Sequence, residues 1–172
     1  MDFLKLAKTR YACRKYSDRK VETEKLNAIL EAGRIAPTAA NRQPQRVIVV
    51  ESQEGLERLT RCTRDFKAPC ALIVCADKSE AWTRKYDGKC VTDIDATIIT
   101  DHMMLEATAQ GLNTLWICMF KPEMVRQEFS LPDNIEPVNI LLVGYGDEEP
   151  LSPERHATTR KALSETIVVE HF

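Results

Sequence analysis

Two arginines near the start of the chain, Arg10 and Arg14, stand four residues apart at the end of an amphipathic segment. At that spacing two side chains share one face of a helix, where like charges repel each other unless an anion lies between them. A guanidinium is the preferred fork for a phosphate group. The polar stretch 36–45 follows, in which Asn41 and Gln43 carry the donors and acceptors that can read the edge of a heteroaromatic ring. Together these residues predict a bound phosphorylated cofactor.

The charge of the chain is unevenly distributed. Residues 1–20 contain seven Lys and Arg against Asp2 and Asp18, a balance of +5, so the remainder carries −7 to give the net charge of −2. An acidic body would repel the backbone of a nucleic acid, so the basic segment favours a localised anion site over a nucleic-acid surface. From charge alone, a solvated helix face is the alternative.

Hydrophobic periodicity predicts the elements that must position these residues. The first helix places Phe3, Leu6 and Ala7 on one face, while Thr23 is expected to cap the second helix and Pro37 to end it. The longest helix has apolar positions on more than one stripe, which predicts a central helix packed on several sides. The expected helices span 2–9, 24–35, 54–62, 91–110 and 122–130, and the expected strands span 46–51, 71–76, 114–118 and 138–143.

The order of these elements predicts an α+β fold rather than a doubly wound nucleotide fold, because the connections are irregular and the sheet is short. No G-x-G-x-x-G follows any strand, and the stretch 144–146 leads into acidic residues instead of a helix. The run 151–159, with Pro153, cannot form much regular structure, yet the chain ends in Ile167-Val168-Val169. An apolar end of this kind usually docks on another surface, and disorder is the alternative.

Composition places the chain among globular proteins. Its 172 residues, 44% of them hydrophobic and 29% charged, fit one domain over 1–172. No apolar run approaches the roughly 20 residues that a membrane span needs, and the first residues lack the order of a signal peptide, so we expect a cytoplasmic protein.

The six cysteines show no C-x-x-C and no metal-like pairing with the three histidines. We therefore expect no metal site, mostly reduced and buried thiols, and a core position for Cys75. His102 and His156 have no recognisable partners, so no role is assigned to them.

A series of motifs along the chain resembles the FMN-dependent nitroreductases. Members of that family open with Arg-x-Ser-x-Arg/Lys, followed by Ala-Pro-Ser-x-x-Asn-x-Gln-Pro before a strand. The resemblance continues through 95–107, 111–117, 142–146 and 160–161, and so covers essentially the whole chain. It implies a nitroreductase-like fold, with a central mostly antiparallel sheet flanked by helices and a C-terminal arm that reaches the partner subunit. The two opening motifs read here Arg10-Tyr11-Ala12-Cys13-Arg14 and Ala36-Pro37-Thr38-Ala39-Ala40-Asn41-Arg42-Gln43-Pro44.

The same resemblance implies FMN as the cofactor and gives roles to individual residues. It places Arg10 and Arg160 on the phosphate and Arg14 on the pyrimidine edge of the ring, where a cation favours the reduced anionic form. The expected cofactor-binding residues are Arg10, Ala12, Arg14, Pro37, Thr38, Asn41, Gln43, Cys118, Met119 and Arg160.

Other parts of the implied site come from the partner subunit or depart from the family pattern. The resemblance brings the loop 37–41 to the ring from the opposite subunit, although Asn41 capping the turn stays an alternative. Backbone groups of Cys118 and Met119 would lie near flavin N5. Ala12 replaces the usual serine and loses one hydrogen bond, worth about 1 kcal/mol. Met119 stands where glycine is common, and Gln45 replaces the usual tryptophan.

The implied activity is electron transfer from NADH or NADPH, as co-substrate, to nitroaromatics, quinones or other electron-poor acceptors by a ping-pong hydride mechanism. No catalytic side chain is expected, because the cofactor carries the chemistry in a homodimer with shared sites. Alternatives are a reductive dehalogenase-like or flavin-fragmenting relative, or a non-catalytic flavin-binding redox sensor using an exposed Cys13 or Cys118. Trp82, Tyr86 and Gly88 belong to a substrate-covering loop or to an ordinary surface loop.

Overall fold

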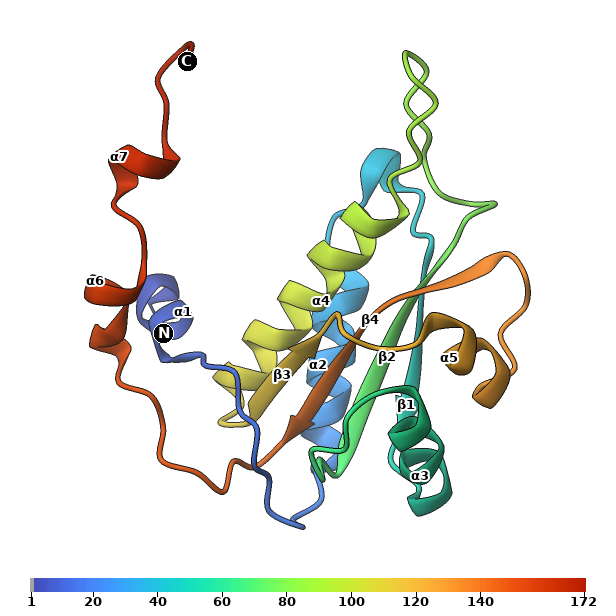
Figure 1. The fold of residues 1–172 in the computed structure, drawn as a ribbon, viewed down its shortest axis with the longest axis vertical. Helices are drawn as coiled ribbons and strands as arrows, with labels where there is room; N and C mark the ends of the chain where they lie inside the picture. Colours follow the sequence, from blue (N-terminus) through green and yellow to red (C-terminus); the bar gives the residue numbers. More distant parts are fainter. Residues whose placement is uncertain (1) are drawn as a thin grey trace.

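A four-stranded sheet forms the centre of the structure, a computed structural model that describes residues 2–172 (Figure 1). Its strands are β1 (Gln45–Val50), β2 (Cys70–Asp77), β3 (Asn113–Ile117) and β4 (Ile135–Gly144), in the spatial order β1-β2-β4-β3. Every neighbouring pair of strands is antiparallel. This arrangement confirms the expected α+β fold with its antiparallel sheet.

The two middle strands are apolar because both of their faces are covered. All eight residues of β2 are buried, and its register with β4 pairs Ile73 with Ile140. The register shifts where Val74 pairs with Asn139 and Cys75 with Pro137. Proline has no backbone N–H to donate to the ladder, and such a bulge is where a strand tolerates it.

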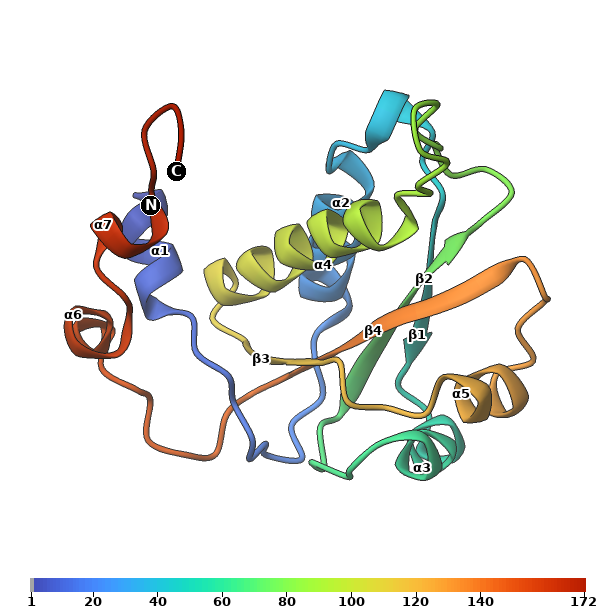
Figure 2. The same ribbon diagram turned by 45° about the horizontal axis from the view of Figure 1, so that its top comes forward.

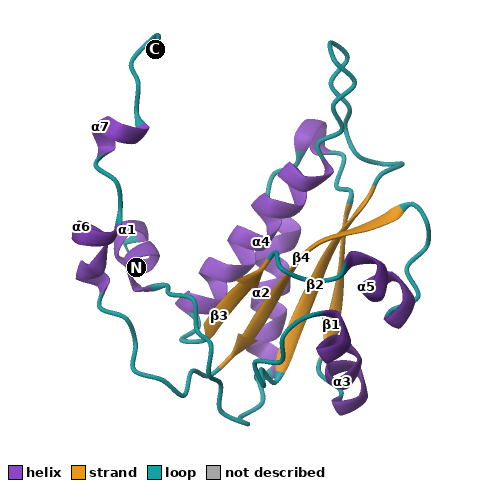
Figure 3. Ribbon diagram, viewed as in Figure 1, coloured by secondary structure: helices purple, strands orange, loops and turns teal. Residues whose placement is uncertain are grey.

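Helices cover both faces of this sheet (Figure 3). Alternate residues of β2 point to opposite faces. Leu72 packs in one core with α2 (Thr23–Ile35) and α4 (Thr92–Ala109), and Ile73 packs in the other core with α3 (Gln53–Cys62) and α5 (Pro122–Glu128). Gly33 lets α2 approach α4 closely, because a Cβ there would lie 2.9 Å from Met103 Cγ. Cys75 is fully buried, as predicted.

The predicted helices and strands are all present, with ends shifted by a few residues. The expected cap of α2 was wrong: Glu22 holds the N-cap position and Thr23 is already helical, without a side-chain cap. Instead, the Glu22 carboxylate accepts from the Tyr145 hydroxyl at 2.7 Å. α2 ends at Ile35, two residues before Pro37, because the residue preceding a proline avoids helical backbone. The central position of α4 is confirmed by its contacts with α1, α2 and all four strands.

Two peripheral parts stand beside this body. They are α1 (Phe3–Thr9) and the C-terminal arm, which we define as residues 151–172 and which contains η2 (Pro153–Arg155), α6 (His156–Thr159) and α7 (Leu163–Thr166). Figures 1 and 2 both show the arm running past α1, away from the sheet.

Neither peripheral part contributes to the cores. α1 has no fully buried residue: on its apolar face Phe3 is 62% exposed, and Leu6 and Ala7 are half-buried. Within the described chain, no residue after Tyr145 belongs to either core. Apolar side chains of the arm are exposed, namely Leu151, Leu163, Ile167, Val168, Val169 and Phe172. Between residues 2 and 172, no helix is both long and apolar enough to cross a membrane.

Candidate functional site

Arg10 ends the first helix instead of continuing it. α1 stops at Thr9, and Arg10 has extended backbone with φ −58° and ψ 130°. The chain then runs beside the start of β3, where the Cys13 N–H donates to the Thr114 carbonyl at 3.0 Å. Arg10 and Arg14 therefore share no helical face, and that prediction was wrong. β3 is an edge strand, so its outer N–H and C=O groups are free to pair with another extended segment. Pairing of the residues after Arg10 with this edge requires extended backbone, which ends the helix.

Arg10 lies with two arginines of the C-terminal arm. Arg155 Nη2 donates to the Arg10 carbonyl at 2.6 Å, and its Nη1 donates to the carbonyls of Lys8 at 3.2 Å and Ser152 at 2.9 Å. Arg160 is exposed and follows directly after α6. We call Arg10, Arg155 and Arg160 the arginine cluster. No sequence motif identified Arg155, whose partners lie up to 147 residues away in the chain.

Over residues 2–172, no member of the arginine cluster forms an ion pair with a carboxylate. Burial lowers the pKa of the Arg10 guanidinium, the charges of Arg155 and Arg160 lower it further, and Asp101 raises it. Three guanidiniums in electrostatic reach of one another are stabilised by an anion, and a phosphate offers several oxygens to such forks. The residues present therefore fit the terminal phosphate of FMN. Within residues 2–172, the arginines that pair with carboxylates are Arg19, Arg34, Arg46, Arg58, Arg61, Arg84 and Arg126.

Arg14 occupies a different place on the extended segment. Its N–H donates to Glu148 Oε1 at 2.7 Å, and its Nη1 donates to the Ala12 carbonyl at 3.2 Å. Its side chain is exposed, while Ala12 is half-buried beside Thr114. The backbone at Arg14 is thus fixed and its guanidinium faces solvent. This arrangement fits separate roles for Arg10 and Arg14, which stay predictions.

The loop of residues 38–43, which we call the polar loop, precedes β1. Ala40, Asn41 and Gln43 have positive φ angles of 49°, 53° and 51°. The Asn41 N–H donates to the Thr38 carbonyl at 3.0 Å, and the Gln43 N–H donates to Thr38 Oγ1 at 3.1 Å. Asn41, Gln43 and the preceding Pro37 are exposed. The loop therefore has a fixed backbone and presents polar side chains outward.

The polar loop and the arginine cluster lie beside different ends of α4. The Ala39 N–H donates to Asp95 Oδ1, in the first turn of α4, at 2.9 Å. Arg10 lines a cavity of about 250 Å³ together with Thr108, in the last turn. Thirteen residues separate Asp95 from Thr108, a rise of about 20 Å along a helix. Within one chain η1 (Ala39–Asn41) and the Arg10 backbone therefore lie beside opposite ends of α4, while the Arg10 guanidinium is in electrostatic reach of Asp101 in the middle of that helix.

The two residues expected near flavin N5 follow β3. Cys118 and Met119 are both exposed, Met119 to 89%. The Met119 carbonyl accepts from Thr63 Oγ1 at 3.0 Å, and the Cys118 carbonyl accepts from the Phe120 N–H at 3.2 Å. Both carbonyls are thus already engaged within the chain.

The cysteines divide into two groups. Cys13 is fully buried, and burial raises the pKa of its thiol, so the proposed exposed sensor at this position was wrong. Cys90 and Cys118 are exposed, and all six thiols are free. Over residues 2–172, no three His, Cys, Asp or Glu side chains gather as metal ligands would.

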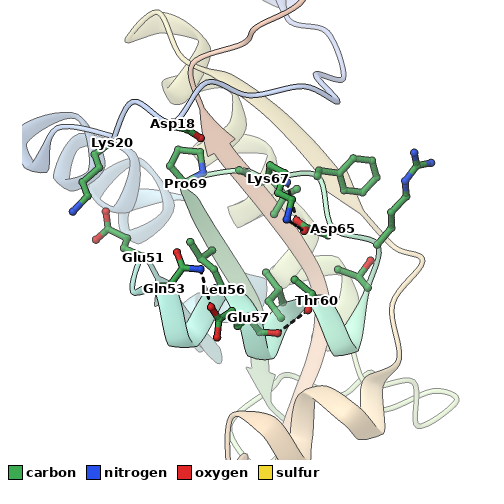
Figure 4. Close-up of a pocket in the computed structure, with 16 residues that line it drawn as sticks. Asp18, Lys20, Glu51, Gln53, Leu56, Glu57, Thr60, Asp65, Lys67 and Pro69 are labelled. Atoms are coloured by element: carbon green, nitrogen blue, oxygen red, sulfur yellow. Dashed lines mark hydrogen bonds and ion pairs between the residues drawn. The ribbon is translucent and has the colours of Figure 1, made fainter.

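A larger groove lies elsewhere, between α3 and the turn that leads to β2 (Figure 4). It has a volume of about 370 Å³, with an apolar floor at Leu56 and Pro69 and charged residues such as Lys20 and Glu57 around it. None of the expected cofactor-binding residues lines it. The groove is therefore separate from the candidate cofactor site.

Comparison with known proteins gives consistent matches along the chain. The family model described as "Nitroreductase family" matches residues 7–66 and 60–145. A protein of Methanothermobacter thermautotrophicus, provisionally named NADH dehydrogenase/NAD(P)H nitroreductase, is 34% identical over 160 residues, which are 87% of this chain and 80% of that protein.

Two solved structures extend these matches to the whole fold. The crystal structure of a nitroreductase family protein from Clostridium difficile 630 has a TM-score of 0.98 and 55% identity, and the match covers 100% of both chains. An FMN-dependent nitroreductase from Clostridium difficile R20291 has a TM-score of 0.82 and 28% identity, over 97% of this chain and 98% of that one. The C-terminal arm and the polar loop thus belong to the matched fold.

Proposed function

This chain belongs to the nitroreductase family, and from that premise we propose that it is an FMN-dependent oxidoreductase. In this proposal, NADH or NADPH supplies the electrons and an electron-poor acceptor, such as a nitroaromatic or a quinone, receives them. The observation that carries the proposal is the arginine cluster, in which Arg155 donates to the Arg10 carbonyl at 2.6 Å and Arg10 lies in electrostatic reach of both arginines of the arm. One similar protein, the nitroreductase of Clostridium difficile R20291, is described as FMN-dependent.

In this proposal, different residues of the chain bind different parts of FMN. Arg10 and Arg160 bind the phosphate through their guanidiniums. Arg155, whose guanidinium donates to the carbonyls of Lys8 and Arg10, fixes the arm beside them and adds positive charge. Arg14 faces the pyrimidine edge, where its charge favours the reduced ring. FMN, when bound, supplies the hydride and electron chemistry, so the protein contributes position, charge and exclusion of water. No side chain is assigned as a general acid or base.

We further propose that the working unit is a twofold dimer with two shared sites. The polar loop and the arginine cluster are separated along α4 in one chain, so a second chain must bring its loop to the cluster if both serve one flavin. The exposed apolar side chains of the arm, such as Leu163, Val169 and Phe172, support this assembly, because a partner surface would cover them.

The cofactor itself is tested by the colour of the purified protein. We expect flavin absorbance bands, and we expect denaturation to release FMN rather than FAD. Chromatography of the released flavin identifies it. Finding FAD, or a protein that binds no flavin on reconstitution, would contradict the proposal.

The shared site is tested by mixing two inactive variants. If Arg10 acts in one subunit and Asn41 in the other, a heterodimer of Arg10→Ala and Asn41→Ala chains collects both defects in one site and leaves the second intact. Random exchange should restore activity to about a quarter of the sites. NADH oxidation with a nitroaromatic acceptor measures it. No recovery, with heterodimers confirmed by mass spectrometry, would rule out sharing.

The alternative function is a flavin-binding redox sensor without turnover. The exposure of Cys118 is the observation that favours it. The same steady-state assay separates the two, since a sensor would bind FMN and yet not oxidise NADH continuously. A cytoplasmic location stays a prediction.

A further inference from the structure

Asp95 is a buried carboxylate that the proposed function does not yet use. It is 1% exposed and lies in the first turn of α4. Its Oδ1 accepts the Ala39 N–H at 2.9 Å, and its Oδ2 is buried without a partner in the described chain. A buried carboxylate is costly to maintain unless it is paired, so its presence calls for a specific task.

Capping its own helix is not that task. The N-cap position of α4 is Val91, and no side chain caps this end of the helix. The Asp95 N–H is already satisfied by the Val91 carbonyl at 3.1 Å. The carboxylate instead reaches outside the helix, to the backbone of the polar loop.

The polar loop needs such an anchor because its backbone is unfavourable. Ala40, Asn41 and Gln43 all have positive φ angles, a backbone conformation that residues other than glycine rarely adopt. Two bonds made by Thr38 close the loop on itself, through its carbonyl and its hydroxyl. The bond to Asp95 is different, because it ties the loop to the buried start of α4.

We propose that Asp95 is a positioning residue that fixes the polar loop in the shape that meets the flavin of the partner subunit. The inference rests on the proposed function, and it adds that a defect at Asp95 weakens FMN binding in the partner's site. Asp95 acts through the loop backbone and touches neither cofactor nor substrate.

Three variants separate positioning from general stability. Asp95→Ala removes the anchor, and Asp95→Asn keeps an oxygen that can accept the Ala39 N–H. Thr100→Val is the matched control, because Thr100 is fully buried in the same helix and donates to Asn139 Oδ1 at 3.0 Å, away from the loop. The midpoint of thermal unfolding shows how far each substitution destabilises the protein.

The first readout is the affinity of the apo-protein for FMN, followed by quenching of flavin fluorescence. We expect Asp95→Ala to bind FMN at least about tenfold more weakly than wild type, the loss of roughly one hydrogen bond to a charged group. Asp95→Asn should restore most of the affinity, and Thr100→Val should bind like wild type even where its midpoint falls as far. Equal affinity of Asp95→Ala and wild type would overturn the inference. Wild type that binds no FMN would instead defeat the proposed function.

The second readout tests action on the partner. Mixing Asp95→Ala with Arg10→Ala should restore up to about a quarter of the sites, because one site of each heterodimer is then intact. Mixing Asp95→Ala with Asn41→Ala should restore none, since both substitutions impair the polar loop of their own chain and every site then receives a defective loop. No recovery in the first mixture, with heterodimers confirmed, would show that Asp95 serves its own subunit and would overturn the inference.

Discussion

Replacing Arg155 by alanine tests whether the C-terminal arm builds the phosphate site. Arg155 donates to carbonyls at the end of α1, those of Lys8 and Arg10, and to Ser152 within the arm. It thereby fixes the start of the arm against the segment that carries Arg10. Its loss should release the arm together with Arg160, and should also remove one of three positive charges.

The magnitude follows from the burial of these bonds. The bond to the Arg10 carbonyl is half-buried, and a hydrogen bond from a charged donor contributes about 1.5–3 kcal/mol. The bonds to Lys8 and Ser152 are exposed and contribute less. Since 1.4 kcal/mol is a factor of ten, we expect the dissociation constant for FMN to rise about 10- to 150-fold.

Fluorescence titration of the apo-protein with FMN measures this change. Arg155→Lys keeps the charge but not the planar fork, so its affinity should fall between those of wild type and Arg155→Ala. Arg126→Ala is the control, because Arg126 donates to the Pro132 carbonyl at 3.3 Å beyond α5, away from the arm. If Arg155→Ala binds FMN as tightly as Arg126→Ala, the arm does not build the site.

Three further predictions concern other groups. Redox titration of FMN-saturated variants should show a lowered flavin potential for Arg14→Ala, whereas Arg160→Ala mainly weakens FMN affinity; an unchanged potential in Arg14→Ala would refute its place at the ring. A thiol reagent should label Cys90 and Cys118 in the folded protein and the other four cysteines only after unfolding, as mass spectrometry can verify; rapid labelling of a buried thiol would contradict the packing. The Tyr145 hydroxyl and Arg19 lower the pKa of Glu22 to about 2 from 4.5, so its stabilising effect is complete above about pH 4.5 and disappears as pH falls to about 2. Wild type should therefore unfold at a higher temperature than Glu22→Gln at pH 7, with a gap that closes toward pH 2, and a gap independent of pH would be the contrary result.

Local patterns in the sequence predicted the body of the fold because the interactions that form it are repetitive. The apolar run of β2 and the several stripes of α4 each follow from burial on more than one side, and both were found as expected. Pro37 ended α2 for a purely local reason, the restricted backbone of the residue before it. Here sequence and structure agree because neighbours in the chain decide the outcome.

The candidate site was less predictable because contacts distant in sequence form it. Arg155 is one half-buried basic residue in a proline-containing run, and its importance depends on carbonyls at the far end of the chain. The prediction that Arg10 and Arg14 share a helical face was wrong because pairing with the edge of β3 ended the helix. Burial of Cys13 follows from that same pairing, which no local pattern shows.

The position of the arginine cluster in the chain has a consequence for biosynthesis. Both cores are complete at Tyr145, whereas two members of the cluster, Arg155 and Arg160, come later. On the ribosome the sheet can close before the phosphate site exists, because a chain folds from its N-terminal part onward. If the proposed function holds, cofactor capture is then the final step of maturation. A nascent chain cut short before Arg155 would be a well-packed but colourless protein.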